Sequence, residues 1–147
     1  MREITLDVGQ VEDLARRLHW GQTDKSGRPY IDHPARVAAL VRDSGGDWTQ
    51  VMAAWLHDSI EDTGTTGKDL TLLGVPSTVV ILVETLTHPS GMSNKDYWER
   101  IAAWPRAVLV KQCDIYDNLD PRRMSYLNSE TQQRLRLKYA KAMEAIS

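Results

Sequence analysis

Apolar residues recur along most of the chain at the three- and four-residue spacing of amphipathic helices. Val11, Leu14, Ala15 and Leu18 follow this spacing and predict a helix over about residues 9–21. The same periodicity, read with the residues that start and stop helices, predicts further helices along the chain. Their expected ranges are 33–44, 47–63, 68–73, 95–103, 105–119 and 129–146.

Several of these boundaries are predicted from residues that satisfy or remove backbone amides. Asp32 is expected to cap the helix that begins at His33-Pro34, because aspartate accepts from free amides and proline suits a first turn. Asp47 is expected to cap the next helix, which should end near Thr63-Gly64. Further along, Ser93 or Asn94 should cap 95–103, and Pro121 should break the helix that Pro105 opens.

Residues 76–87 contain an apolar run, Val79–Val83, that favours a strand by propensity alone. No second run of similar strength is present to pair with it, and an isolated strand would leave backbone groups unsatisfied. We therefore expect 76–87 to form a buried helix. With no repeat or linker in the sequence, the prediction is an all-α fold built as one domain over residues 1–147.

Composition excludes several classes of protein. A chain of 147 residues can bury about 68–70% of its unfolded surface, so it needs no disulfides for a core. Its one cysteine indicates a reducing compartment, and a net charge of -2 gives no basic footprint for nucleic acid. No apolar run approaches the about 18 residues of a membrane span, and residues 1–8 do not resemble a signal peptide. We expect a soluble cytoplasmic protein with neither nucleic acid nor membrane as partner.

The first candidate for chemistry is the segment LHDSIEDT, residues 56–63. On one helix His57 and Glu61 would be i, i+4 neighbours, as would Asp58 and Asp62. Three carboxylates at one helix end repel one another unless a cation or solvent compensates them. A solvated acidic helix end with a hydrogen-bonded histidine and a metal site are both open interpretations of this segment.

Two more residues extend the candidate set. His33 lies at a predicted helix start, and Asp114 lies on a helix whose other face is apolar. Together with His57 and Asp58 they would make a set of two histidines and two carboxylates. Such a set suits a divalent ion such as Mn²⁺, Fe²⁺ or Zn²⁺. Sequence spacing alone does not establish that the four residues converge.

Three ordered segments carry a family resemblance: HWGQTDKSGRPYIDHP (19–34), AAWLHDSIEDT (53–63) and VKQCDIYDNLDP (110–121). They resemble the HD-domain phosphohydrolase superfamily. More narrowly, they are similar to the hydrolase domain of RelA/SpoT enzymes and to small alarmone hydrolases, the metazoan SpoT homologues among them. The resemblance implies a helical HD-domain bundle. It also implies one Mn²⁺ per chain, held by His33, His57, Asp58 and Asp114.

The same resemblance implies roles for other residues. Glu61 and Asp62 would orient or deprotonate the attacking water, and Asn118 would contact the ribose of a nucleotide. Lys25 and Ser26 would lie beside its base. The family reaction removes the 3′-pyrophosphate from (p)ppGpp, so a small phosphorylated nucleotide is the expected partner. Because only about 22 residues follow the matched part, we expect no synthetase domain and a degradative activity.

Two positions depart from the family pattern. Asp24 stands where the family commonly has an arginine that stacks on guanine, and Ile115 stands where arginine or lysine is frequent. An acidic side chain supplies no cation–π contact and repels phosphates. Two alternatives therefore stay open: the same metal site acting on another nucleotide such as NADPH, and a nucleotide-binding regulatory module without turnover. A homo-oligomer also stays open, and tryptophans exposed on helices would favour it.

Overall fold

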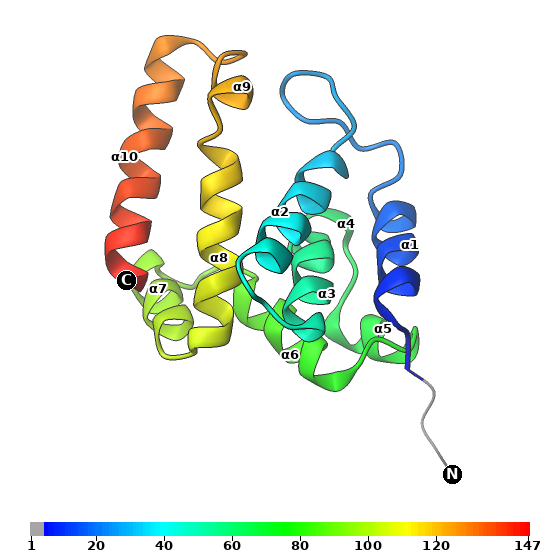
Figure 1. The fold of residues 1–147 in the computed structure, drawn as a ribbon. Coiled ribbons are helices and arrows are strands. Elements are labelled where there is room, and N and C mark those ends of the chain that lie inside the picture. The colour runs from blue at the N-terminus through cyan, green and yellow to red at the C-terminus, as the bar shows by residue number, and fades with distance from the viewer. Residues whose placement is uncertain (1–4) are drawn as a thin grey trace.

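Helix α3 (Trp48–Leu56) lies at the centre of the fold, because its residues from Gln50 to Leu56 are all buried. In the computed structural model, which describes residues 5–147, it is surrounded by longer helices (Figure 1). It packs against four of them: α1 (Val8–Leu18), α2 (Asp32–Asp43), α6 (Ser77–Leu86) and α8 (Pro105–Asn118).

Shorter elements and a C-terminal helix complete the described chain. They are α4 (Ser59–Thr63), α5 (Gly67–Leu72), α7 (Asn94–Ala102), α9 (Pro121–Met124) and α10 (Ser129–Ile146). Between residues 5 and 147 the only β pairing is an isolated bridge between Thr23 and Pro29, so the all-α prediction is confirmed. Within the same range no helix combines the length and the apolar character needed to cross a bilayer. Half of the segment 1–8, residues 1–4, lies outside the described residues.

Helix α6 confirms the helix predicted for 76–87 despite the strand propensity of its sequence. Its buried residues are Val79, Val80, Leu82, Val83 and Leu86. They spread around more than one face because α6 contacts α3, α5, α7 and α8. Burial on several sides therefore outweighs the modest preference of β-branched residues for strands.

The single helix predicted for 47–63 is wrong, because α3 ends at Leu56 and α4 starts at Ser59. At the break, His57 Nδ1 lies 2.6 Å from the Ala54 carbonyl oxygen. The Ser59 hydroxyl donates to the Leu56 carbonyl at 2.7 Å. These two side chains bond backbone carbonyls that would otherwise accept from the backbone amides of a continuing helix. The chain therefore turns at His57-Asp58.

The caps were predicted with mixed success. Asp47 accepts from the Gln50 amide at 3.0 Å, and Ser93 accepts from the Asp96 amide at 3.0 Å, so both caps are confirmed. The cap predicted at Asp32 is wrong, since Asp32 is itself the first residue of α2. The Asp32 amide already donates to the Pro29 carbonyl at 3.3 Å, so the preceding turn runs directly into the helix.

Pro121 ends the course of α8 as predicted and also opens the short helix α9. At the other break, Gly64 ends α4 with a φ of 71°, a left-handed conformation that favours glycine. Both residues set the direction of the chain next to the candidate site described below.

Replacing the Asp47 cap with alanine should lower the free energy of unfolding by about 1 kcal/mol at neutral pH. Burial would raise the pKa of Asp47, but hydrogen bonds from Thr49, Gln50 and Arg106 outweigh it and lower the pKa. Because the folded-state pKa is depressed, this stability is present above the unfolded-state pKa and is lost as pH falls. The difference in the free energy of unfolding between the wild type and Asp47→Ala, measured by urea denaturation, should therefore decrease as the pH falls toward about 3.

Asp43→Ala is the matched control, because Asp43 is 70% exposed at the end of α2. It should change the free energy of unfolding by less than about 0.5 kcal/mol. An Asp47→Ala protein as stable as the wild type would show that the cap does not stabilise α3.

Candidate metal centre and adjoining pocket

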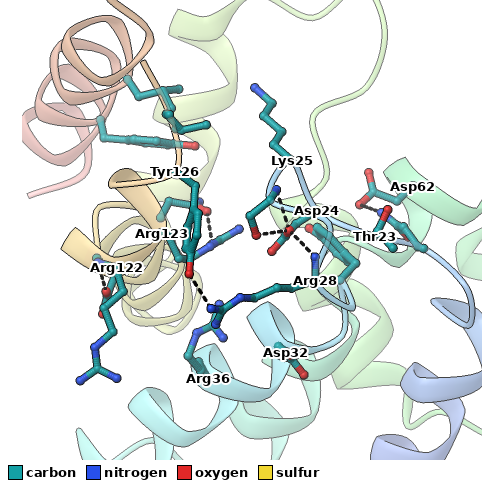
Figure 2. A pocket seen from close by; sticks show the side chains of 18 of the residues that line it. Thr23, Asp24, Lys25, Arg28, Asp32, Arg36, Asp62, Arg122, Arg123 and Tyr126 are labelled. Atoms are coloured by element: carbon teal, nitrogen blue, oxygen red, sulfur yellow. Dashed lines mark hydrogen bonds between the residues drawn. The ribbon is translucent and has the colours of Figure 1, made fainter. Parts of the chain in front are cut away.

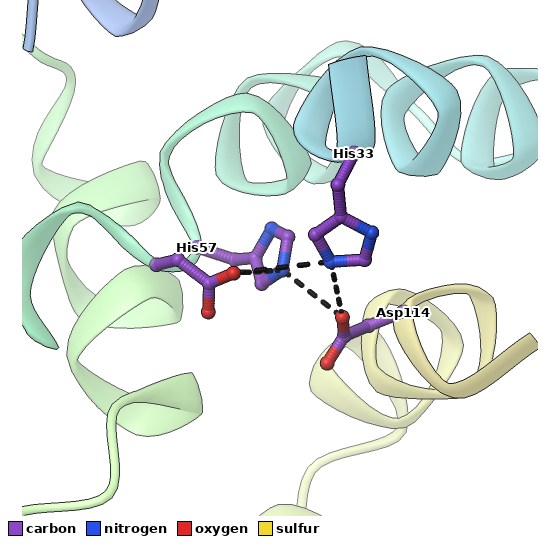
Figure 3. Close-up of side chains that lie close together, drawn as sticks. His33, His57 and Asp114 are labelled. Atoms are coloured by element: carbon purple, nitrogen blue, oxygen red, sulfur yellow. Dashed lines mark hydrogen bonds and ion pairs between the residues drawn. The ribbon is translucent and has the colours of Figure 1, made fainter. Parts of the chain in front are cut away.

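Four side chains from three parts of the chain meet in the interior. His33 comes from the first turn of α2, His57 and Asp58 from the break after α3, and Asp114 from α8. One ligand atom from each lies within 4.8 Å of the others. Figure 3 shows His33, His57 and Asp114 pointing toward one another. The structure thus brings together the four residues that the sequence grouped.

Both imidazoles are held so that Nε2 faces the carboxylates. His57 Nδ1 lies against the Ala54 carbonyl, which only accepts, so Nδ1 carries a proton and Nε2 presents its lone pair in the neutral ring. His33 Nδ1 lies 2.6 Å from the Asp117 carboxylate. The Nε2 atoms of His33 and His57 lie 2.8 and 3.2 Å from the same oxygen of Asp114.

The two carboxylates are fixed by donors of their own. Lys111 Nζ donates to Asp114 Oδ2 at 2.9 Å, which leaves Oδ1 turned toward the histidines. The Asn118 amide donates to that Oδ1 at 3.2 Å. The Tyr30 hydroxyl donates to Asp58. Each of these donors restricts the rotation of a carboxylate.

The electrostatics of the cluster favour positive charge. Burial would lower the pKa of His57, but Asp58 and Asp114 outweigh it and raise this pKa well above its usual range. Burial would likewise raise the pKa of Asp114, yet Lys111 and His57 hold it well below its usual range. Two imidazole nitrogens and two ionised carboxylates at one point form a donor set that suits a divalent metal ion. These residues could hold such an ion.

Asp117 belongs to this arrangement and was missed in the sequence. It is buried, and besides His33 it accepts from Arg36 Nε at 2.8 Å. Arg123 Nη1 lies 3.1 Å from its Oδ2 and 2.9 Å from His33 Nδ1. The two arginines balance its charge. Its position three residues after Asp114, on the same face of α8, is the signal that could have identified it.

Glu61 and Asp62 lie next to the cluster but have different neighbours. Glu61 accepts from the backbone amide of His88, the second residue after α6. Burial raises the pKa of Glu61, and the bond from His88 opposes this only in part. Asp62 accepts from Gln22 Nε2 at 3.2 Å and lines a pocket.

This pocket has a volume of about 600 Å³ and lies between the loop that follows α1 and the helices α9 and α10 (Figure 2). Tyr30 and Asn118 line it and also bond to Asp58 and Asp114, so the cluster adjoins the pocket. Basic side chains outnumber acidic ones in its wall. The basic residues are Lys25, Arg28, Arg36, Arg122, Arg123, Arg134 and Lys138, and the acidic ones are Asp24, Asp32, Asp62 and Asp120.

Lys25, Ser26 and Asn118, the residues expected at a nucleotide, all line this pocket. Asn118 spans two partners, because its side-chain oxygen accepts from Arg123 Nη1 at 2.8 Å while its amide nitrogen donates to Asp114. Lys25 and Ser26 thus contribute to the pocket wall from the loop before α2, and Asn118 contributes from the end of α8.

Asp24 lines the pocket, but one of its carboxylate oxygens is engaged within its own loop. Its Oδ1 accepts from the Ser26 amide at 2.9 Å, the Ser26 hydroxyl at 2.6 Å and the Arg28 amide at 3.0 Å (Figure 2). The carboxylate therefore organises its own loop. Besides Lys25 this loop carries the cation Arg28, whose guanidinium lies 5.1 Å from the ring centre of Tyr126 across the pocket.

The chain is similar in sequence to a known protein family and to proteins of known name. A family model described as HD domain matches residues 12–140. A probable guanosine-3′,5′-bis(diphosphate) 3′-pyrophosphohydrolase of Synechocystis is 35% identical over 133 residues, covering 83% of this chain. The bifunctional (p)ppGpp synthase/hydrolase SpoT of Escherichia coli is 39% identical over 97 residues, covering 66% of this chain. The chain spans only 17% and 14% of the length of these two relatives.

A solved structure has the same fold. It belongs to a metazoan ortholog of SpoT that hydrolyses ppGpp and plays a role in starvation responses. The two structures superpose with a TM-score of 0.78 at 24% identity, over 99% of this chain and 88% of the other. The arrangement of helices is therefore that of an HD-domain bundle.

Removing the charge of Asp117 should weaken metal binding without removing a ligand. With Mn²⁺ as the probe in isothermal titration calorimetry, Asp117→Asn should bind about 10-fold more weakly than the wild type, because His33 loses its anionic partner. Asp114→Ala should bind no Mn²⁺ at micromolar concentration. Asp13→Asn, the same change at an exposed site on α1, should bind as the wild type does. Stoichiometric Mn²⁺ in Asp114→Ala would refute that ligand.

Proposed function

Because this chain belongs to the HD-domain family, we propose that it is a metal-dependent phosphohydrolase that removes the 3′-pyrophosphate of (p)ppGpp. The observation that carries the proposal is the convergence of two histidines and two aspartates beside a pocket with a basic wall. The names of the relatives support the substrate. They support the resemblance to RelA/SpoT-type hydrolases that the sequence motifs indicated.

We assign the metal to His33, His57, Asp58 and Asp114, with one Mn²⁺ per chain. A divalent ion bound there would lower the pKa of a water molecule and offset phosphate charge. The protein's contribution is to hold the four ligands in place. It does so through Ala54, Asp117, Lys111 and Tyr30, which bond to the ligands from outside the cluster.

Glu61 and Asp62 are the candidates for handling the proton of the attacking water. In the reaction, water adds to phosphorus, the bond to the 3′-oxygen breaks and that oxygen gains a proton, so the products are pyrophosphate and GDP or GTP. The raised pKa of Glu61 makes its carboxylate more basic, which suits a group that accepts a proton from water. Asp62 lines the pocket and would face the substrate.

The pocket wall would bind the nucleotide. Lys25 and Ser26 lie on the loop after α1 and are assigned to the base, and Asn118 is assigned to the ribose. Arg122, Arg134 and Lys138, on the opposite wall, would offset phosphate charge. Because Asp24 bonds within its own loop, it argues less strongly against a guanosine nucleotide than its sequence position did.

The setting of the protein is also a proposal. Cys113 is buried and reduced, which fits the cytoplasm, and we take residues 1–147 as one HD-type domain. Trp48 in the first turn of α3 is 60% exposed, which is the pattern that was expected to favour a homo-oligomer, whereas Trp20, 88% exposed, lies in the turn after α1. A homo-oligomer therefore stays a prediction.

The function is tested by incubating metal-stripped protein with ppGpp, pppGpp and NADPH, each with and without Mn²⁺, and resolving the products. Release of pyrophosphate from the guanosine nucleotides should require Mn²⁺. Glu61→Gln should lower kcat by about 100-fold or more, because the amide accepts no proton. Glu99→Gln, the same change on an exposed side chain of α7, should leave kcat unchanged.

Turnover of NADPH without turnover of ppGpp would refute (p)ppGpp as the substrate. It would leave the proposal of a metal-dependent phosphohydrolase in place. Binding of ppGpp without turnover, unaffected by Glu61→Gln, would instead favour a regulatory module.

A further inference from the structure

Gln22 lies between a buried histidine and the carboxylate of Asp62. His19, at the end of α1, is buried, and its Nδ1 lies 2.8 Å from Gln22 Oε1. Gln22 Nε2 lies 3.2 Å from Asp62 Oδ2. We propose that Gln22 is a positioning residue that holds Asp62 for water activation, with its amide oxygen anchored on His19. The inference rests on the proposed function, because it assumes the role given there to Asp62.

The orientation of the Gln22 amide follows from the chemistry of its two neighbours. The Asp62 carboxylate only accepts, so the atom facing it has to be the amide nitrogen. The amide oxygen then faces His19 and requires a proton on Nδ1. His19 Nε2 has no hydrogen-bond partner within residues 5–147, which is consistent with a lone pair at that atom. The reversed amide would place its oxygen against a carboxylate, so Asp62 selects this orientation, and His19 fits it in the tautomer that carries its proton on Nδ1.

The backbone around Gln22 is fixed on both sides. The Gln22 backbone amide donates to the His19 backbone carbonyl at 3.0 Å. The Gln22 backbone carbonyl accepts from the Tyr30 backbone amide at 2.8 Å. The rings of His19 and Tyr30 pack with centroids 5.1 Å apart. Since the Tyr30 hydroxyl donates to Asp58, one loop reaches both the metal cluster and Asp62.

Asp62 needs such support because its own helix gives little. Helix α4 has five residues, and Asp62 is exposed near its end. A glutamine holds one carboxylate oxygen and leaves the other for a proton from water. It also adds no charge, whereas a lysine or arginine at this position would lower the basicity of the carboxylate. Glu61 differs, because its donor is the His88 backbone amide, which every replacement of His88 except proline would keep.

Two substitutions test the assignment. Gln22→Leu removes both hydrogen bonds, and Gln22→Glu keeps an acceptor for His19 but places an oxygen against Asp62. With ppGpp and Mn²⁺, each should lower kcat by about 10-fold while KM stays within about twofold, because positioning acts on the chemical step. Mn²⁺ affinity should be unchanged. Gln10→Glu, the same change in the exposed first turn of α1, should leave kcat and KM unchanged.

A double-mutant cycle with Asp62→Asn separates positioning from a general structural role. If Gln22 acts through Asp62, adding Gln22→Leu to Asp62→Asn should lower kcat by less than about twofold further. A further 10-fold loss in that background would overturn the inference, as would a raised KM with unchanged kcat. In the metal-free protein, Asp62→Asn should also shift the NMR resonances of the Gln22 side-chain amide. Unshifted resonances would overturn the contact itself.

The same measurements distinguish this inference from the function on which it rests. An Asp62→Asn protein with wild-type kcat would refute the role of Asp62 in the proposed reaction. Loss of kcat in Asp62→Asn, together with wild-type kcat in both Gln22 variants, would overturn only the role of Gln22.

Discussion

The fold is constrained most strongly by the need to keep two imidazoles and two carboxylates together inside a helical core. Such groups lose hydration on burial, and each has to regain hydrogen bonds from the protein. His57 is fixed by the carbonyl of Ala54, and His33 by Asp117. These bonds explain why α3 ends where it does and why α2 and α8 approach each other at their polar positions.

Much of the helical framework could be predicted from the sequence, because periodicity and caps are local properties. The sequence was sufficient for the Asp47 cap, which depends on nearby residues, and for the buried helix α6, because no second apolar run was present to pair with it as a strand. The break at His57-Asp58 could not be predicted, because it depends on side chains that bond backbone carbonyls in a specific rotamer. Asp32 was misassigned for a related reason: the turn in front of it already satisfies the first amides.

The candidate site was predicted in part. The four residues of the cluster were grouped by residue type and by motif, but their convergence depends on how α2, α3 and α8 pack. Asp117 and Gln22 were missed because each acts on another side chain, and sequence spacing does not show which one. Asp24 was interpreted from its charge alone, whereas one of its carboxylate oxygens accepts hydrogen bonds from Ser26 within its own loop.

The contact between Arg28 and Tyr126 joins the loop after α1 to the segment between α9 and α10. The two parts of the site, the cluster and the pocket wall, come largely from different elements. The cluster is built from α2, the end of α3 and α8, while much of the pocket wall comes from that loop and the last two helices. Under the proposed function, exposed positions in α10 can therefore diverge among descendants of one ancestor while the residues of the cluster stay the same. The architecture would then let selectivity for a nucleotide evolve separately from the means of cleaving it.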